Sequence, residues 1–235
     1  MVSRRHDRRA SAANERHYQP FAFRHDITRR LVRVMGEFTE GFELLASLRR
    51  PVTFFGSARI GKDSGYYQAA RQLARKLGRA GFTIVTGGGP GLMEAANRGA
   101  VEAKAPSIGL NIQLPREQRV NAYVRRGMGF FYFFSRKTML TTSAQAYVFF
   151  PGGFGTLDEF FSIVTLIQTK KIEPRPIVLF GRDYWRKLNY FIKENMVRRH
   201  RTIAPRDLQE YRITDDVDEA YHWVRQSKER RYTSM

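Results

Sequence analysis

Cysteine is absent from the 235 residues of this sequence, which excludes disulfide bonds and thiolate metal sites. Nothing in the composition therefore argues for an oxidising compartment. Long apolar runs are also absent, since no stretch approaches the length that crosses a membrane. The arginine-rich start lacks the apolar segment of a secretory signal. From these absences we expect a cytoplasmic protein with no membrane partner.

Acidic residues are few, with 22 Asp and Glu against 41 Lys and Arg, and the formal net charge is +19. Such a charge attracts polyanions, so nucleic-acid binding must be considered. Much of the excess lies at the two ends of the chain, and basic terminal runs are more often solvated tails than recognition surfaces. The aromatic run at 130–134 suits a core or a subunit contact. Specific nucleic-acid binding is therefore not expected.

The ends of the chain differ from its middle. Residues 1–25 are polar and basic without an apolar period, which predicts a disordered tail. Apolar positions then recur every three or four residues over 27–48, which predicts an amphipathic helix packed on the rest. Because 42% of the residues are apolar, residues 26–235 are expected to bury one core and form a single domain.

Strands and helices alternate beyond the first helix. Apolar runs predict strands at 52–55, 82–86, 107–114, 129–134, 146–150 and 177–180. Helical spacing or cap signals predict helices at 66–79, from 92 onward, and at 135–142, 157–168, 184–197 and 217–226. This order predicts an α/β fold, a doubly wound Rossmann-like parallel sheet with helices on both faces. Its ligand site is expected at the carboxyl ends of the strands.

Three glycine clusters follow predicted strands, at 56–61, 87–91 and 152–155. Glycine lets the backbone approach a ligand closely, and the free amides at a helix N-terminus favour an anion. Three such loops at corresponding strand ends indicate one crevice. We expect this crevice to bind phosphate.

Two familiar phosphate motifs do not fit these loops. The segment G-S-A-R-I-G-K-D at 56–63 nearly matches a P-loop, but it ends in Asp63, which has no hydroxyl for magnesium and would repel a phosphate. A dinucleotide pattern G-x-G-x-x-G that starts at Gly87 fails at Leu92. Neither ATP hydrolysis nor NAD binding is therefore supported.

Two charged motifs leave alternatives open. Thr156-x-x-Glu159 is a capping-box pattern, in which Thr156 caps a helix and Glu159 reaches back to the Thr156 amide, so Glu159 has a structural as well as a functional interpretation. Ser135 is expected to cap the helix whose first turn holds Arg136 and Lys137. Cations there oppose the helix dipole, so either a nearby carboxylate or a ligand phosphate should compensate.

Motifs in three segments together resemble the LOG ("lonely guy") family. They are P-G-G-x-G-T-x-x-E at 151–159, the pair Arg136-Lys137 upstream of it, and G-G-G-P-G-L-M-E-A-A-N-R-G-A at 87–100. Longer bacterial members also carry a helix with the motif E-F-x-E-G-F-E, which stands here at 37–43. The combination is specific for the family and less so for the substrate.

The resemblance runs from about Phe38 to about Ile177. Members of the family are phosphoribohydrolases of cytokinin riboside 5′-monophosphates. It therefore implies hydrolysis of the N-glycosidic bond of a purine nucleoside 5′-monophosphate, either AMP or an N6-modified AMP, to free base and ribose 5-phosphate. No metal and no organic cofactor is implied. The alternative is a protein of the same fold that binds a nucleotide or phosphorylated ligand without cleaving it.

The resemblance also implies roles for particular residues. Glu159 and Arg136 occupy the catalytic positions. A carboxylate near the sugar can stabilise an oxocarbenium-like transition state, and Arg136 could bind the phosphate or ribose and hold Glu159 ionised. The expected substrate and phosphate contacts are Gly152, Gly153, Gly155, Thr156, Gly88, Gly89, Gly91, Met93, Glu94, Lys137, Gly56 and Ser57.

Some features depart from the family pattern. Gln145 stands where plant members commonly have an acidic residue, and Asp158 replaces a glutamate beside the catalytic one. Both changes concern base preference more than hydrolysis. Some members have been labelled lysine decarboxylases, but no lysine here stands in a recognisable pyridoxal-phosphate context. Because the family forms dimers and larger assemblies, a homodimer or larger homo-oligomer is expected.

Overall fold

The computed structural model describes residues 27–113 and 120–229. The basic tail predicted for residues 1–25 lies outside this part of the chain. The chain divides into two compact units, residues 1–36 and residues 37–235. Helix α1 (Ile27–Ala46) begins in the first unit, and its second half belongs to the second unit, where Leu44 and Leu45 enter the core.

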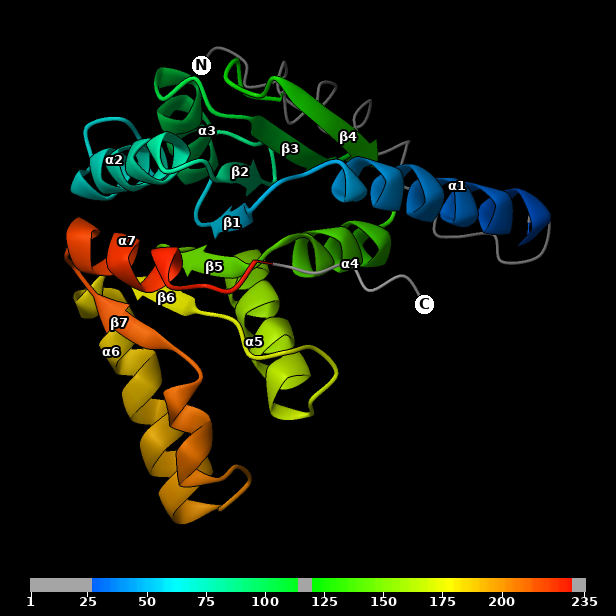
Figure 1. The fold of residues 1–235 in the computed structure, drawn as a ribbon. Helices are drawn as coiled ribbons and strands as arrows, with labels where there is room; N and C mark the ends of the chain where they lie inside the picture. Colours follow the sequence, from blue (N-terminus) through cyan, green and yellow to red (C-terminus); the bar gives the residue numbers. More distant parts are fainter. Residues whose placement is uncertain (1–26, 114–119, 230–235) are drawn as a thin grey trace, which may run out of the picture. The chain divides into compact units, whose positions relative to one another are not determined.

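One parallel sheet forms the centre of the second unit, with seven strands in the described residues (Figure 1). Their order is β4-β3-β2-β1-β5-β6-β7, and every neighbouring pair is parallel. The strands are β1 (Pro51–Phe55), β2 (Thr83–Thr86), β3 (Ser107–Ile112), β4 (Arg126–Phe130), β5 (Ala146–Phe149), β6 (Ile177–Phe180) and β7 (Arg212–Thr214). The chain order reverses at β1, which pairs with β2 on one side and β5 on the other, so β1 and β5 flank the switch point.

Helices cover both faces of the sheet, as Figure 1 shows. One face carries α2 (Gly65–Arg79), α3 (Leu92–Glu102) and α7 (Val217–Arg225). The other carries α4 (Phe133–Ser143), α5 (Phe154–Gln168), α6 (Arg182–Phe191) and the second half of α1. Every residue of β1 and β5 is buried because both of their faces are covered. The predicted doubly wound α/β fold is therefore confirmed.

The period of two along β1 assigns its side chains to the two layers. Val52 and Phe54 pack with α2 and α3, whereas Phe55 packs with the opposite layer, where it stacks on Phe149 at 4.6 Å between ring centroids. This alternation explains why a short, uniformly apolar run suffices for a central strand.

The prediction for residues 129–134 is wrong. The strand there is β4, which ends at Phe130, and helix α4 already begins at Phe133. The aromatic run at 130–134 suggested a strand, but the pairing of β4 with β3 requires glycine at position 127. A side chain at Gly127 would clash with the backbone oxygen of Gly109 on β3. Of the run 130–134 only Phe130 is buried, so the run does not form a core element, and a subunit contact stays a prediction.

Smaller differences lie near the end of the chain. The helix predicted at 184–197 begins two residues earlier, as α6, and continues as a π-helical segment, Ile192–Arg199. A 3₁₀ turn, Pro205–Gln209, and strand β7 were not predicted. β7 has only three residues, which are too few for an alternation of apolar and polar residues to be recognised in the sequence. No helix in the described residues is both long and apolar enough to cross a membrane.

Candidate active site

The three glycine loops meet at the carboxyl ends of β2, β1 and β5. The backbone N–H of Ser57 donates to the carbonyl of Pro151 at 3.0 Å, and the N–H of Leu92 donates to the carbonyl of Ser57 at 3.1 Å. Gly91 has φ +68°, and a Cβ there would lie 2.5 Å from the Ser57 oxygen. Glycine is therefore required for the close approach of these loops.

Helix α5 begins at Phe154, directly after the glycine turn and earlier than predicted. Gly153 is the N-cap residue and provides no side-chain cap, whereas the N–H groups of Thr156 and Leu157 donate to the Gly153 carbonyl at 3.0 and 3.1 Å. Thr156 thus lies inside the first turn. The predicted capping box is wrong, because the glycine turn passes straight into the helix.

The glycines of this turn serve two purposes. A side chain at Gly152 would collide with the Thr156 side chain, so packing requires glycine at this position. Gly153 and Gly155 have open space where a Cβ would stand. Packing within the described chain therefore does not explain them, and the first turn of α5 is accessible to a ligand. The unpaired amides of a first helical turn favour an anion.

Glu159 lies in the second turn of α5 and is 7% exposed. Its Oε2 atom is buried and has no hydrogen-bond partner among the described residues. Burial raises the pKa of Glu159 to about 7, although the charges of Arg136 and Lys137 lower it. Arg136 favours the ionised form of Glu159, as predicted, but burial outweighs the nearby cations. Near neutral pH this carboxyl exchanges between its two protonation states.

Arg136 lies on α4, and its side chain reaches strand β3 and the loop after β2. Its Nε donates to the carbonyl of Leu110 at 2.7 Å. The end of the guanidinium fills the space above Gly87, where any side chain would clash with Nη2 and would come within 2.9 Å of the Met93 sulfur. Burial lowers the pKa of Arg136, and the charge of Glu159 opposes this. Gly87 thus makes room for the cation beside the carboxylate.

The start of α4 differs from the prediction. Tyr132 is the N-cap and Ser135 lies in the first turn, so Ser135 is not the cap. Its hydroxyl is buried and donates to Glu37 and to the Tyr132 carbonyl, the latter at 3.0 Å. A carboxylate therefore lies at this helix start, as the first of the two alternatives expects, whereas a compensating ligand phosphate stays a prediction.

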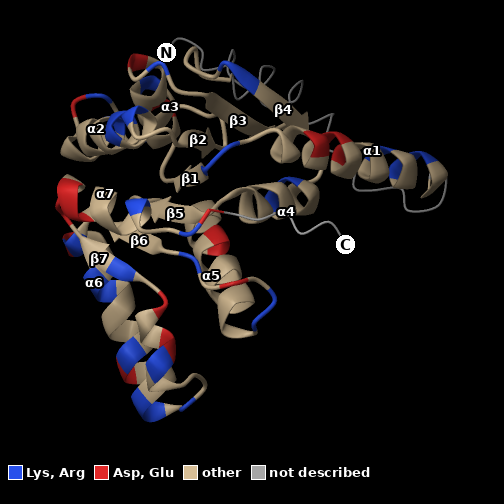
Figure 2. Cartoon of the chain, in the orientation of Figure 1, with Lys and Arg blue, Asp and Glu red and all other residues tan. Residues whose placement is uncertain are grey.

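Lys137, on α4, contacts two side chains of α5. Its Nζ lies 2.5 Å from the Asp158 carboxylate and donates to the Ser162 hydroxyl at 3.2 Å. Figure 2 shows basic residues on α4 and acidic residues on α5. The pair is partly exposed, so its contribution to stability is small. A contact of Lys137 with substrate phosphate stays a prediction.

The loop after β2 rests on a buried polar network that the sequence did not predict. The side-chain amide of Asn121 donates to the carbonyls of Gly88 at 3.1 Å and Gly89 at 2.9 Å, and to the side-chain oxygen of Asn97 at 3.0 Å. Thr86 donates to Asn97 and accepts from the Gly88 N–H. Asn97 is fully buried on an otherwise apolar helix face, and this is the signal that could have identified the network.

Glu94 and Gly56 connect the first glycine loop to its neighbours. Glu94 accepts from the Tyr67 hydroxyl at 3.0 Å and pairs with Lys62 at 3.3 Å. Lys62 is the lysine of the segment that nearly matches a P-loop, and it therefore pairs with a carboxylate of the protein. A Cβ at Gly56 would lie 2.8 Å from Leu92, so glycine there is needed for packing.

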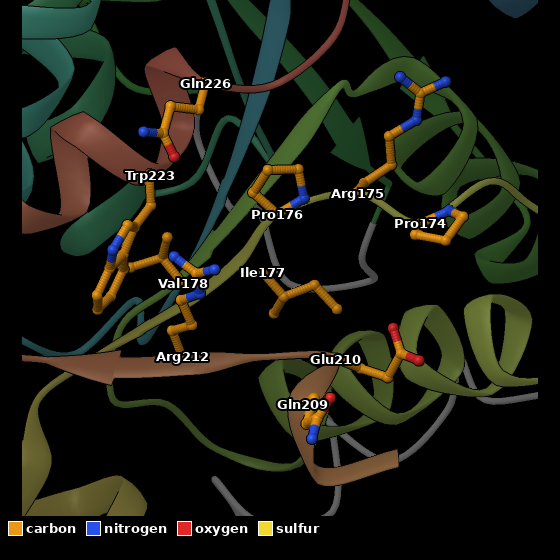
Figure 3. A pocket seen from close by; sticks show the side chains of 10 residues that line it. All are labelled: Pro174, Arg175, Pro176, Ile177, Val178, Gln209, Glu210, Arg212, Trp223 and Gln226. Carbon is orange, nitrogen blue, oxygen red and sulfur yellow. The ribbon is translucent and has the colours of Figure 1, made fainter. Parts of the chain in front are cut away.

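A separate cavity of about 310 Å³ opens at the opposite, amino ends of β6 and β7 (Figure 3). The Arg212 guanidinium lies 5.4 Å from the centre of the Trp223 ring. Arg175 pairs with Glu173 at 3.1 Å and donates to the Lys228 carbonyl at 3.3 Å. Both cations are thus engaged within the protein, and this cavity is not part of the glycine-loop site.

Comparison with known proteins places this site in a family. A family model described as "Possible lysine decarboxylase" matches residues 93–224, more than half of the chain and a stretch that contains Arg136 and Glu159. The chain belongs to this family, the LOG family. The described residues contain no cluster of three or more side chains suited to hold a metal ion.

Several relatives carry a phosphoribohydrolase name. A rice protein (Oryza sativa subsp. japonica) named as a probable cytokinin riboside 5′-monophosphate phosphoribohydrolase is 34% identical over 149 residues, 61% of this chain and 59% of the relative. The rice cytokinin riboside 5′-monophosphate phosphoribohydrolase LOG is 31% identical over 60% of this chain and 58% of its own length. A bacterial enzyme with that activity in its name, from Rhodococcoides fascians, is 25% identical over 67% of this LOG-family chain and 81% of its own. The chain thus spans less than two thirds of the two rice proteins.

Solved structures confirm the fold. The molybdenum cofactor carrier protein from Chlamydomonas reinhardtii aligns with a TM-score of 0.56 at 22% identity, over 76% of this chain and 97% of that one. A molybdenum cofactor binding protein from Rippkaea orientalis aligns with a TM-score of 0.54 at 18% identity, over 74% and 93%. At this identity the likeness concerns the fold alone.

Proposed function

We propose that this LOG-family protein hydrolyses the N-glycosidic bond of a purine nucleoside 5′-monophosphate, AMP or an N6-modified AMP. The products would be the free base and ribose 5-phosphate. The observation that carries the proposal is the buried Glu159, whose Oε2 has no partner among the described residues and which stands with Arg136 beside three glycine loops. A buried carboxyl without partners is costly for a fold, and such groups concentrate at functional sites.

The proposed chemistry uses both protonation states of Glu159. In the ionised form it stabilises positive charge on the ribose and accepts a proton from the attacking water, whose oxygen bonds to C1′ as the bond to the base breaks. The same proton then passes to the departing base. A pKa of about 7 suits a group that accepts and returns a proton near neutral pH.

Substrate binding is proposed to use the glycine turn and the cation. The first turn of α5, with Gly153 and Gly155 open to a ligand, would bind the 5′-phosphate through backbone amides. Arg136 would add charge-assisted hydrogen bonds to the phosphate or ribose. The names of the rice and Rhodococcoides relatives agree with such a substrate.

A second candidate is a binding protein of the same fold that does not cleave its ligand. The fold-level likeness to molybdenum cofactor carrier and binding proteins favours it, because such proteins carry a ligand on this scaffold. The retained pair of Glu159 and Arg136 argues for the enzyme, since a carrier has no need of a buried, unpartnered carboxyl.

The test is a chromatographic assay of base release from AMP, isopentenyladenosine monophosphate, GMP and the matching nucleosides. Base from monophosphates but not from nucleosides is expected, and the ratio between AMP and its prenylated form identifies the preferred substrate. Saturable binding of AMP without any base release would instead support the binding protein. The variant Glu173→Gln, which changes an exposed loop carboxylate, serves as a matched control.

A further inference from the structure

Glu37 is a buried carboxylate that the proposed chemistry does not use. It lies on α1 within the second unit and is 8% exposed. Its Oε1 accepts from the backbone N–H of Phe131 at 2.7 Å, and its Oε2 accepts from the Ser135 hydroxyl. A buried carboxylate is costly unless it is hydrogen-bonded, and both oxygens have partners here. Both partners lie more than 90 residues away in sequence.

These two partners bracket the start of α4. Phe131 and Ser135 lie on either side of Phe133, the first helical residue, and the N-cap Tyr132 makes no side-chain cap. The first turn of α4 also contains no acidic residue. Glu37 therefore supplies, from another helix, both the hydrogen-bond acceptor and the negative charge that a helix start favours.

One helical turn further, the same face of α1 meets α4 again. A Cβ at Gly41 would lie 2.7 Å from the Met139 sulfur, so the two helices come close together at this point. Glu37 and Gly41 are four residues apart and share a helix face. The second half of α1 thus seats α4 through one polar contact and one close apolar contact.

Arg136 directly follows Ser135 in this seated turn. Its Nε must reach the Leu110 carbonyl, and its guanidinium must fit above Gly87. A rotation or shift of the α4 start would move both contacts. We propose that Glu37 is a positioning residue for Arg136, fixing the start of α4 so that the guanidinium stands beside Glu159. This inference rests on the proposed function of the site.

The main variant is Glu37→Gln, which keeps the shape and one acceptor but loses the charge. We expect kcat for base release from AMP to fall roughly 10-fold to 100-fold, because a small misplacement of a catalytic group costs about that much. The kcat of Glu37→Ala should fall further, and the kcat of Ser135→Ala should fall less. Glu40→Gln removes an exposed charge from the same helix and should leave kcat unchanged.

A double-mutant cycle separates positioning from general stability. If Glu37 acts through Arg136, then Glu37→Gln added to Arg136→Ala should change kcat by less than about 2-fold. If the kcat of the double variant fell by the product of the two single-variant effects, the proposal would be overturned. A folded Glu37→Gln variant with the kcat of the wild-type protein would also overturn it.

A second measurement does not depend on turnover. Arg136 lowers the pKa of Glu159, so its displacement in Glu37→Gln should raise that pKa above its wild-type value near 7. Carbon-detected NMR titration of the Glu159 carboxyl would measure the shift, with Glu40→Gln as the control. An unchanged pKa would contradict the inference. If the wild-type protein released no base, the proposed function would fail, whereas this titration would still decide the role of Glu37.

Discussion

Substitution of Glu159 by glutamine should stabilise the fold above neutral pH. In the folded protein burial raises the pKa of Glu159 to about 7 from an ordinary value of 4.5. Between these values the folded state keeps a proton that the unfolded chain has released. Stability therefore falls as pH rises through this window, and the full cost is present above about pH 7.

The size of the effect follows from the same two values. One unit of pKa corresponds to about 1.4 kcal/mol, so ionising Glu159 in the folded state costs about 3 kcal/mol at pH 8. Glu159→Gln keeps the shape of the side chain and carries no charge at any pH. It should therefore match the wild-type free energy of unfolding at pH 4.5 within about 1 kcal/mol, and exceed it by about 2 to 3 kcal/mol at pH 8.

Chemical denaturation of both proteins at pH values from 4.5 to 8.5 measures this difference. Glu173→Gln provides the control, since that carboxylate is 82% exposed and its replacement leaves the buried carboxyl of Glu159 in place. A constant difference between Glu159→Gln and wild type across the range would refute the reasoning. It would mean that Glu159 is either solvated or paired in the folded protein.

Three further predictions concern other residues of the glycine-loop site and its supports. Gly91→Ala should lower the free energy of unfolding by about 2 to 4 kcal/mol in denaturant titrations, because φ is +68° and the new Cβ would meet the Ser57 oxygen; stability close to that of the wild type would contradict this. Asn97→Ala should cost about 2 to 3 kcal/mol by the same measurement, since its buried partners lose their hydrogen bonds, and a loss below about 0.5 kcal/mol would count against the network. Lys137→Met should cost less than about 1 kcal/mol because its pair with Asp158 is partly exposed, whereas KM for AMP should rise if Lys137 binds phosphate; an unchanged KM would remove it from the binding site.

The sequence predicted the central strands and the meeting of the glycine loops because both follow from local patterns. β6 (Ile177–Phe180) matches its predicted range residue for residue, and β1 starts one residue before its predicted range, since buried strands appear as short apolar runs. The start of α5 was placed too late because Thr156 and Glu159 imitate a capping box, whereas Gly153 ends the turn three residues earlier.

Other features depend on contacts between distant parts of the chain. The carboxylate that faces the start of α4 is Glu37, and the nearer of its two partners lies 94 residues along the chain. The pKa of Glu159 depends on how deeply α5 is buried, which no local motif encodes. The expected homo-oligomer also stays a prediction, which light scattering in solution tests.

The most direct test of the central claim is a single-turnover reaction of AMP with the wild-type protein and with Glu159→Gln, following adenine and ribose 5-phosphate together. We predict equal amounts of both products from the wild-type protein, and binding of AMP without measurable adenine release by the variant. Adenine release by Glu159→Gln at the wild-type rate would contradict the role of Glu159. Binding without release by the wild-type protein would contradict the proposed hydrolysis itself.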